Sequence, residues 1–243
     1  LLIARYIKVE DGSFALIERD KSSFELQDIS LEANINRSKQ EALFKLLCNT
    51  SFNGEEGKVN VNGTIKSDLE PLEFNIEANI TDLQMGGLDK LASYTGLYKQ
   101  PVLLKSIGPT MDIHLELNSE TNQAVASIKS KHLNLNLDTN NKSSPPLVFD
   151  WAVNPSLLKL FGVELKRPFF ISSHASQLKI PSIEKWKKLA IDMKAVVSNL
   201  EIDNLLVDHS AIELQSSNLS EKILVKSSSN FSSPCLSGEL SIG

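Results

Sequence analysis

Apolar and polar residues alternate with a period of two along most of this chain. In "HLNLNLD", residues 132–138, three leucines fall on one side of an extended chain and the polar residues fall on the other. This period is that of a β-strand with one covered face and one solvated face. It recurs in "KVNVNGTIK", "PLEFNIEANI" and "MDIHLELN". The alternation predicts a mainly β protein, and it raises the question of what covers the apolar side of each strand.

The predicted fold is a long, twisted antiparallel sheet that forms either an open groove or a two-layer sandwich, with a few short helices. Helical patterns are limited to residues near 87–95, 154–161 and 182–189. The first closes on Gly96, a residue type that favours the left-handed conformation just beyond a helix C-terminus. The second begins at Asn154 and has a proline in its first turn, as helices often do.

Two aspartates near the N-terminus predict local departures from regular strands. "YIKVEDGSFALIE" reads as two short strands joined by a turn at Asp11-Gly12, because an Asp-Gly pair is a strong hairpin signal. In "SFELQDISLEANI" the alternation shifts phase at Asp28-Ile29, which predicts a bulge or a kink.

The length of 243 residues allows one large β domain or two small ones. We expect a single elongated β domain over residues 1–243. Two segments look alike, since each has a leucine-bearing helix, a glycine, basic residues and a proline before an apolar strand. This likeness indicates repeat units near 87–153 and 154–243, although two weakly matched copies also arise by chance. The chain opens on "LLIARYIKVEDG" without Met, so we interpret it as a piece of a longer protein.

The charge of the chain argues against nucleic acid as a partner. The net charge is −5 and the pI is about 5.5, so the sequence as a whole offers no positive field. Only four of the 25 basic residues are arginines, the residue type that reads phosphates and bases through paired hydrogen bonds.

No motif in the sequence carries recognisable catalytic or cofactor chemistry. No nucleophile elbow, phosphate-binding glycine loop or zinc-protease motif occurs. None of the four histidines has a second ligand at metal-binding spacing: His114, His132, His174 and His209. The sequence therefore predicts a protein that is not an enzyme and has no cofactor and no metal.

Two features each leave two interpretations open. Cys48 and Cys235 lie far apart in the sequence and form either one long-range disulfide or two buried free thiols. Trp186 stands among lysines, a pattern typical of a membrane interface but also of a tryptophan that covers the end of a core. The residues of this candidate membrane-interface cluster are Lys185, Trp186, Lys187 and Lys188.

The opening third resembles the AsmA-like and TamB-like family of bacterial envelope proteins. The resemblance rests on "VEDGSFALIERDKSSFELQDISLEANI", with an acidic residue at Asp20 before a strand and a Leu-x-x-Ile-x-Leu register that starts at Leu26. It also rests on "VNGTIKSDLEPLEFNIEANITDLQMGGLDKLASYTG", which is similar to the family's paired strands, polar link and leucine-rich helix. It spans residues 6–96. The family's N-terminal membrane anchor has no counterpart in this sequence.

The resemblance implies a repeating β-groove whose apolar concave face holds lipid. The function expected from it is a periplasmic, non-enzymatic segment that holds or conducts lipid acyl chains, attached to the inner membrane through a segment outside this sequence. Expected partners are acyl chains, the membrane surface and other envelope proteins. The alternative is a closed β-sandwich that serves as a binding or scaffold module, with its function in polar loops such as 118–123 and 138–146. The candidate groove residues all alternate onto an apolar face: Val59, Val61, Ile65, Phe74, Ile76, Ile113, Leu115, Leu133, Leu135, Phe149 and Trp151.

Overall fold

The computed structural model describes residues 6–17, 23–36, 39–66, 73–98, 101–139, 145–179, 190–202, 205–218, 222–232 and 237–242. The chain divides into two compact units, Leu1–Lys131 and His132–Gly243. This division does not coincide with the repeat units expected near 87–153 and 154–243, so the repeat stays a prediction. The third expected helix, near 182–189, the cluster around Trp186, and Cys235 all lie outside the described residues.

The described part of the first unit forms seven strands and two helices. They are β1 (Tyr6–Ile17), β2 (Ser23–Asn36), β3 (Glu41–Phe52), β4 (Glu55–Lys66), β5 (Glu73–Gln84), α1 (Met85–Tyr94), α2 (Leu103–Ser106), β6 (Thr110–Asn118) and β7 (Gln123–Ser130).

The described part of the second unit forms seven strands and one helix. They are β8 (Leu133–Asp138), β9 (Leu147–Val153), α3 (Pro155–Lys159), β10 (Phe169–Lys179), β11 (Ala190–Ile202), β12 (Leu205–Asn218), β13 (Lys222–Ser232) and β14 (Ser237–Ile242).

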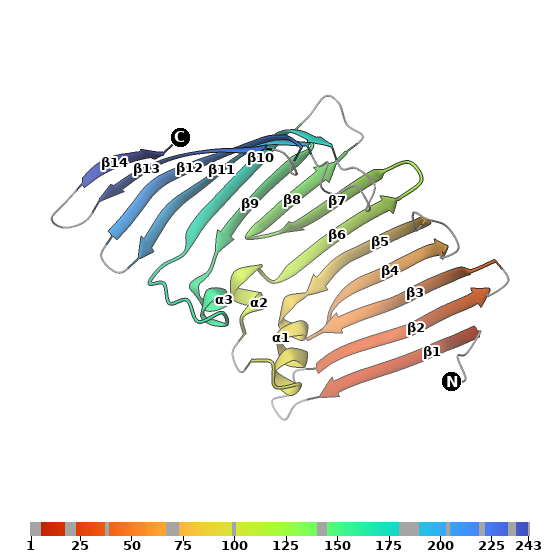
Figure 1. The fold of residues 1–243 in the computed structure, drawn as a ribbon. Helices are drawn as coiled ribbons and strands as arrows, with labels where there is room; N and C mark the ends of the chain where they lie inside the picture. The colour runs from red at the N-terminus through yellow and green to blue at the C-terminus, as the bar shows by residue number, and fades with distance from the viewer. Residues whose placement is uncertain are drawn as a thin grey trace. The chain divides into compact units, whose positions relative to one another are not determined.

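Within each unit, strands that are neighbours in the chain are also neighbours in the sheet, as Figure 1 shows. The pairings β1 to β7 in the first unit, and β8 to β14 in the second, are antiparallel. Within each unit the sheet is open. The prediction of a mainly β, antiparallel protein with a few short helices is confirmed, and the sheet within each unit takes the open form.

The predicted hairpin at Asp11-Gly12 is wrong. β1 is one continuous strand that pairs with β2 on both sides of this dipeptide, with register shifts around Gly12. Asp11 has a φ of 53°, the left-handed conformation that an Asp-Gly pair favours in a turn and that here forms a bulge. The predicted bulge at Asp28 is confirmed, since its φ is 51° and the β2–β3 register shifts between Gln27 and Ser30.

Both helices that the structure describes near predicted positions carry the expected end signals. α1 is followed by Gly96, whose φ is 78°. α3 begins after Asn154, whose side chain accepts a hydrogen bond of 2.9 Å from the backbone N–H of Ser156. The four-residue α2 was not predicted, because it is too short to display a helical period.

Candidate functional site

The register of the first unit gathers its apolar side chains on one side of the sheet. Val61 of β4 lies opposite Leu46 of β3 and Ala78 of β5, and Ala78 in turn lies opposite Leu115 of β6. Directly opposed residues in an antiparallel pair point to the same face. We call this surface the first apolar face. Its members on β2 to β6 include Leu31, Ala33, Phe44, Leu46, Cys48, Val59, Val61, Ile65, Phe74, Ile76, Ile80, Ile113, Leu115 and Leu117.

The second unit has an equivalent surface, the second apolar face. Leu133 of β8 lies opposite Trp151 of β9, and Leu135 lies opposite Phe149. The rings of Phe149 and Trp151 meet edge to face, with centroids 6.2 Å apart. Trp151 lies opposite Ile171 of β10, so the apolar row continues beyond β9.

The second apolar face becomes more polar toward β13. Ser210 of β12 lies opposite Ser229 of β13, and their hydroxyl groups are hydrogen-bonded at 2.8 Å. Ile212 likewise lies opposite Ser227. Aliphatic side chains therefore share this part of the face with hydroxyl groups.

The eleven candidate groove residues are all half-buried. Seven of them lie on the first apolar face and four on the second, and each has an exposure between that of a core residue and that of a surface residue. Side chains of this kind in the middle of a sealed sandwich would be buried. Within each unit, the described residues therefore leave these side chains only partly covered, including the leucines of "HLNLNLD".

α1 covers one end of the first apolar face. Met85, its first residue, is completely buried, and Phe24 at the start of β2 is 3% exposed. A Cβ at Gly87 would overlap the ring of Phe24, and one at Gly86 would lie 2.6 Å from the ring of Phe52. The two glycines let the helix approach these rings closely, so α1 forms a wall where β2 begins and β3 ends.

One buried carboxylate joins this wall to the segment that follows it. Asp89 of α1 is 5% exposed and accepts hydrogen bonds from the backbone N–H groups of Val102, Leu103 and Leu104, at 2.8–3.0 Å. It also accepts one of 2.9 Å from the hydroxyl of Tyr98. Burial, together with this bond to Asp89, raises the pKa of Tyr98. The backbone groups at the start of α2 are thus satisfied from α1.

A glycine inside β4 makes room for an aromatic ring on the first apolar face. A Cβ at Gly63 would lie 2.5 Å from Cζ of Phe44, its cross-strand neighbour. The ring of Phe44 therefore covers the gap that the glycine leaves.

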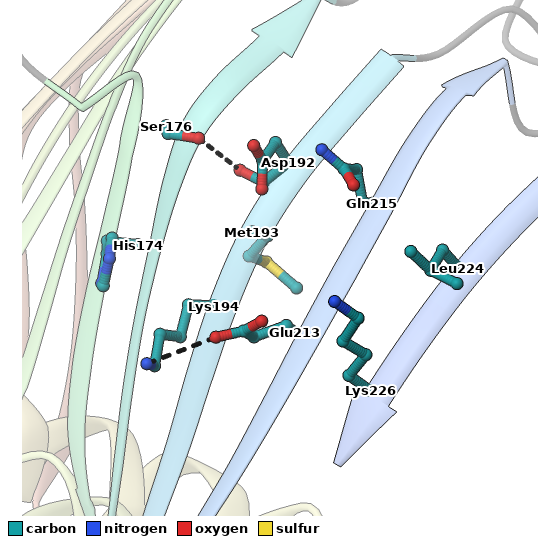
Figure 2. A pocket seen from close by; sticks show the side chains of 9 residues that line it. All are labelled: His174, Ser176, Asp192, Met193, Lys194, Glu213, Gln215, Leu224 and Lys226. Carbon is teal, nitrogen blue, oxygen red and sulfur yellow. Dashed lines mark hydrogen bonds and ion pairs between the residues drawn. The ribbon is translucent and has the colours of Figure 1, made fainter. Parts of the chain in front are cut away.

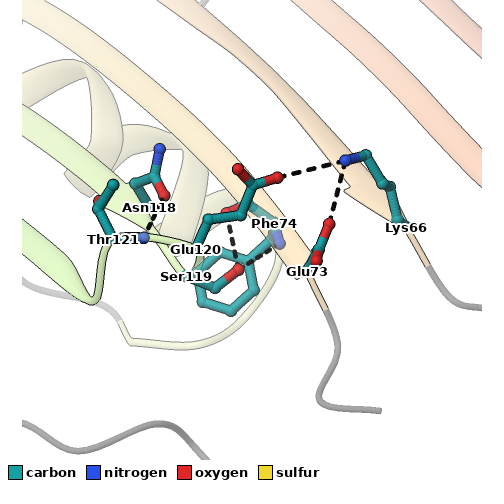
Figure 3. Close-up of polar contacts among 7 residues, drawn as sticks. All are labelled: Lys66, Glu73, Phe74, Asn118, Ser119, Glu120 and Thr121. Atoms are coloured by element: carbon teal, nitrogen blue, oxygen red, sulfur yellow. Dashed lines mark hydrogen bonds and ion pairs between the residues drawn. The ribbon is translucent and has the colours of Figure 1, made fainter. Parts of the chain in front are cut away.

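The opposite face of the first unit is mainly polar, and some of its charged side chains form ion pairs. At the edge of the sheet away from α1, Lys66 forms ion pairs of 3.0 Å with Glu73 and 3.3 Å with Glu120 (Figure 3). The hydrogen bonds to Glu73 and Glu120 raise the pKa of Lys66. Next to this network, Ser119 accepts a hydrogen bond of 2.7 Å from the backbone N–H of Phe74. We call the segments around Lys66, Glu73 and Ser119–Thr121 the polar rim.

The polar face of the second unit carries a depression of about 340 Å³. Figure 2 shows Lys194 and Glu213 paired across β11 and β12, at 3.4 Å, with Lys226 nearby on β13. Its other lining residues are His174, Ser176, Asp192, Met193, Gln215 and Leu224. Because this surface is lined by solvated charges, it fits the outer side of an amphipathic sheet.

Cys48 is a free cysteine that lies on the first apolar face opposite Val59. Burial raises the pKa of its thiol, since an apolar surrounding disfavours the thiolate. The thiol of Cys48 can therefore serve as a native chemical probe of the first apolar face.

The described residues contain no group of three His, Cys, Asp or Glu side chains that could hold a metal ion. His114 contacts Asn79 at 2.6 Å and Glu116 at 3.2 Å on the polar face of the first unit. In the same described part of the chain, no helix is both long enough and apolar enough to cross a bilayer.

Sequence reasoning placed the candidate residues on the correct strands but named too few of them. It omitted Phe44, Leu46 and Cys48 of β3, which extend the same face, although they follow the same period-two signal. It also missed the role of Asp89, whose partners are backbone groups 13–15 residues away.

No family model, curated protein or solved structure matches this chain.

Proposed function

We propose that this chain is a non-enzymatic segment that holds or conducts lipid acyl chains along its apolar β faces. The observation that carries the proposal is the half-burial of all eleven candidate residues, aligned in register on one side of the sheet in each unit. The resemblance of residues 6–96 to the AsmA-like family supports a place in the bacterial periplasm, in transport between membranes.

The chemistry of the two faces suits an acyl chain. Each buried CH₂ group contributes about 0.8 kcal/mol, so a chain of 16 carbons drawn bare into water would lose on the order of 13 kcal/mol. Rows of Val, Leu, Ile and Phe side chains would offset most of that loss without any chemical step. The polar rim and the polar face would remain in water, where a headgroup is stable.

The composition of the first apolar face also favours lipid over a folded protein partner. Protein interfaces are typically anchored by a few large aromatic and arginine side chains in a polar surround. The rows on β4, β5 and β6 are instead mainly aliphatic over their whole length, as in the pairs Val61–Ala78 and Ile80–Ile113. Such a surface provides area without fixed anchor points, which fits a fluid hydrocarbon chain.

Alkylation of Cys48 tests the proposal directly. In a Cys235→Ser variant the only thiol lies on the first apolar face. We expect phospholipid vesicles to slow its reaction with a maleimide, and native mass spectrometry of the same sample to show bound phospholipid. A Thr64→Cys variant in a Cys48→Ser, Cys235→Ser background is the matched control, because Thr64 alternates onto the other side of β4. Equal rates for Cys48 with and without lipid, and no bound phospholipid, would contradict the proposal.

A further inference from the structure

We infer that an acyl chain in the first unit lies along the strands, with its methyl end against α1 and its headgroup at the polar rim. This inference rests on the proposed function and adds a direction to it. It follows from the different structures of the two ends of the first apolar face.

The end at α1 is closed. Phe24 and Thr50 are 3% and 2% exposed, and Met85, the first residue of α1, is completely buried. Three of the four hydrogen bonds that Asp89 accepts come from Val102, Leu103 and Leu104 and tie α1 to the start of α2. A hydrocarbon chain would meet a wall of packed, buried side chains here.

At the end with the polar rim, the described residues of the first unit include no helix, since α1 and α2 both lie at the other end of the strands (Figure 1). Ile35, at the far end of β2 from Phe24, is 37% exposed. Ile65 and Phe74 face each other across β4 and β5 and are half-buried. The neighbouring Lys66 and Glu73 end β4 and begin β5, and their side chains, 38% and 30% exposed, lie on the opposite face of the sheet (Figure 3). A headgroup at this end would stay hydrated.

The length of the uncovered strip fits one acyl chain. On β3 the strip runs from Cys48, next to the region that α1 covers, to Ala42, which lies opposite Ile65. Six residue steps at about 3.3 Å each give roughly 20 Å. One leaflet of a bilayer has about half of the ~30 Å hydrocarbon thickness, or roughly 15 Å. One chain therefore fits between wall and rim when it lies parallel to the strands.

Site-specific fluorescence quenching measures the direction. In a Trp151→Phe, Trp186→Phe background, Phe52→Trp places one indole beside α1, and Phe74→Trp places one at the polar rim. Both are aromatic replacements on half-buried positions. We expect phospholipids brominated near the methyl end of the chain to quench Trp at position 52 more strongly than at 74. We expect lipids brominated near the carboxyl end to reverse that order.

Photo-crosslinking of the unmodified protein provides a second measurement, which does not depend on whether a variant folds. A phospholipid with a diazirine at the end of its chain should label peptides from α1 and the end of β3, and one with a diazirine near the glycerol should label peptides around Lys66 and Glu120. Equal or reversed patterns in either experiment would overturn the direction while leaving lipid binding intact. Absence of quenching at both positions, and of labelling anywhere on the first apolar face, would instead contradict the proposed function.

Discussion

A single charge placed on the second apolar face separates an open sheet from a sealed core. Leu135 lies on β8 opposite Phe149, and both side chains are half-buried. We predict that Leu135→Asp leaves the unit folded and lowers its lipid content. The neighbouring Asn136→Asp is the matched control, because Asn136 alternates onto the exposed polar face.

The magnitude follows from the exposure of Leu135. Complete burial of a leucine side chain contributes about 1.5–3 kcal/mol, so loss of a half-covered one costs about 0.8–1.5 kcal/mol. The new carboxylate could still reach water and would not have to be buried unpaired. In a sealed core the same carboxylate would cost several kcal/mol more, a large part of the 5–15 kcal/mol by which domains are typically stable.

Urea denaturation followed by circular dichroism gives the change in the free energy of unfolding. Native mass spectrometry of the same preparations gives the lipid content. We expect Asn136→Asp to match the parent in both measurements. Complete unfolding by Leu135→Asp, or a loss of more than about 4 kcal/mol, would refute the reasoning, since it would mean that the leucine row is sealed.

Three further predictions concern the first unit. Asp89→Asn should lower the free energy of unfolding by about 2–3 kcal/mol in urea denaturation, because the buried N–H and O–H donors around Asp89 lose a charged acceptor. Gly63→Val should cost about 1–3 kcal/mol in the same assay, because its side chain would displace the ring of Phe44. The rate of alkylation of Cys48 should increase over a higher pH range than that of a free thiol with a pKa of 9.0, because burial raises the pKa of Cys48. The raised pKa also contributes stability to the folded state that is fully present below pH 9 and is lost as the pH rises through the folded-state pKa. Cys48→Ser should therefore flatten the pH dependence of the free energy of unfolding in that range.

The period-two pattern predicted the strands and their apolar faces because it is a local property of the backbone. Successive side chains of a strand point to opposite sides whatever the strand pairs with. The pairing of Ile65 with Phe74 and of Leu135 with Phe149 therefore keeps the predicted faces together. The pattern could not say whether the two units share one core, because that depends on contacts between distant segments.

The failures of the sequence prediction have a common physical origin. Asp11-Gly12 favours the left-handed conformation in both a tight turn and a bulge, and only pairing along the whole of β2 makes it a bulge. Asp89 reads as an ordinary acidic residue of an amphipathic helix. Its burial depends on backbone groups at the start of α2, and a four-residue helix leaves no periodic signal.

The choice between groove and sandwich depends on what covers the apolar side, and alternation carries no information about that. A long apolar face left uncovered would be unusual, since soluble proteins seldom expose contiguous apolar patches larger than a few hundred Å². Among the described residues of the first unit, α1 covers the end of the first face near Phe24 and Phe52, and the aliphatic rows on β3 to β6 extend beyond it. A second protein layer would have to be complementary in shape to a surface with few anchoring side chains. A fluid hydrocarbon chain can adapt its conformation to such a surface. If lipid binds as proposed, the same closed end at which α1 buries Phe24 would also stop the acyl chain, and one short helix would account for both the packing of the unit and the direction of the acyl chain.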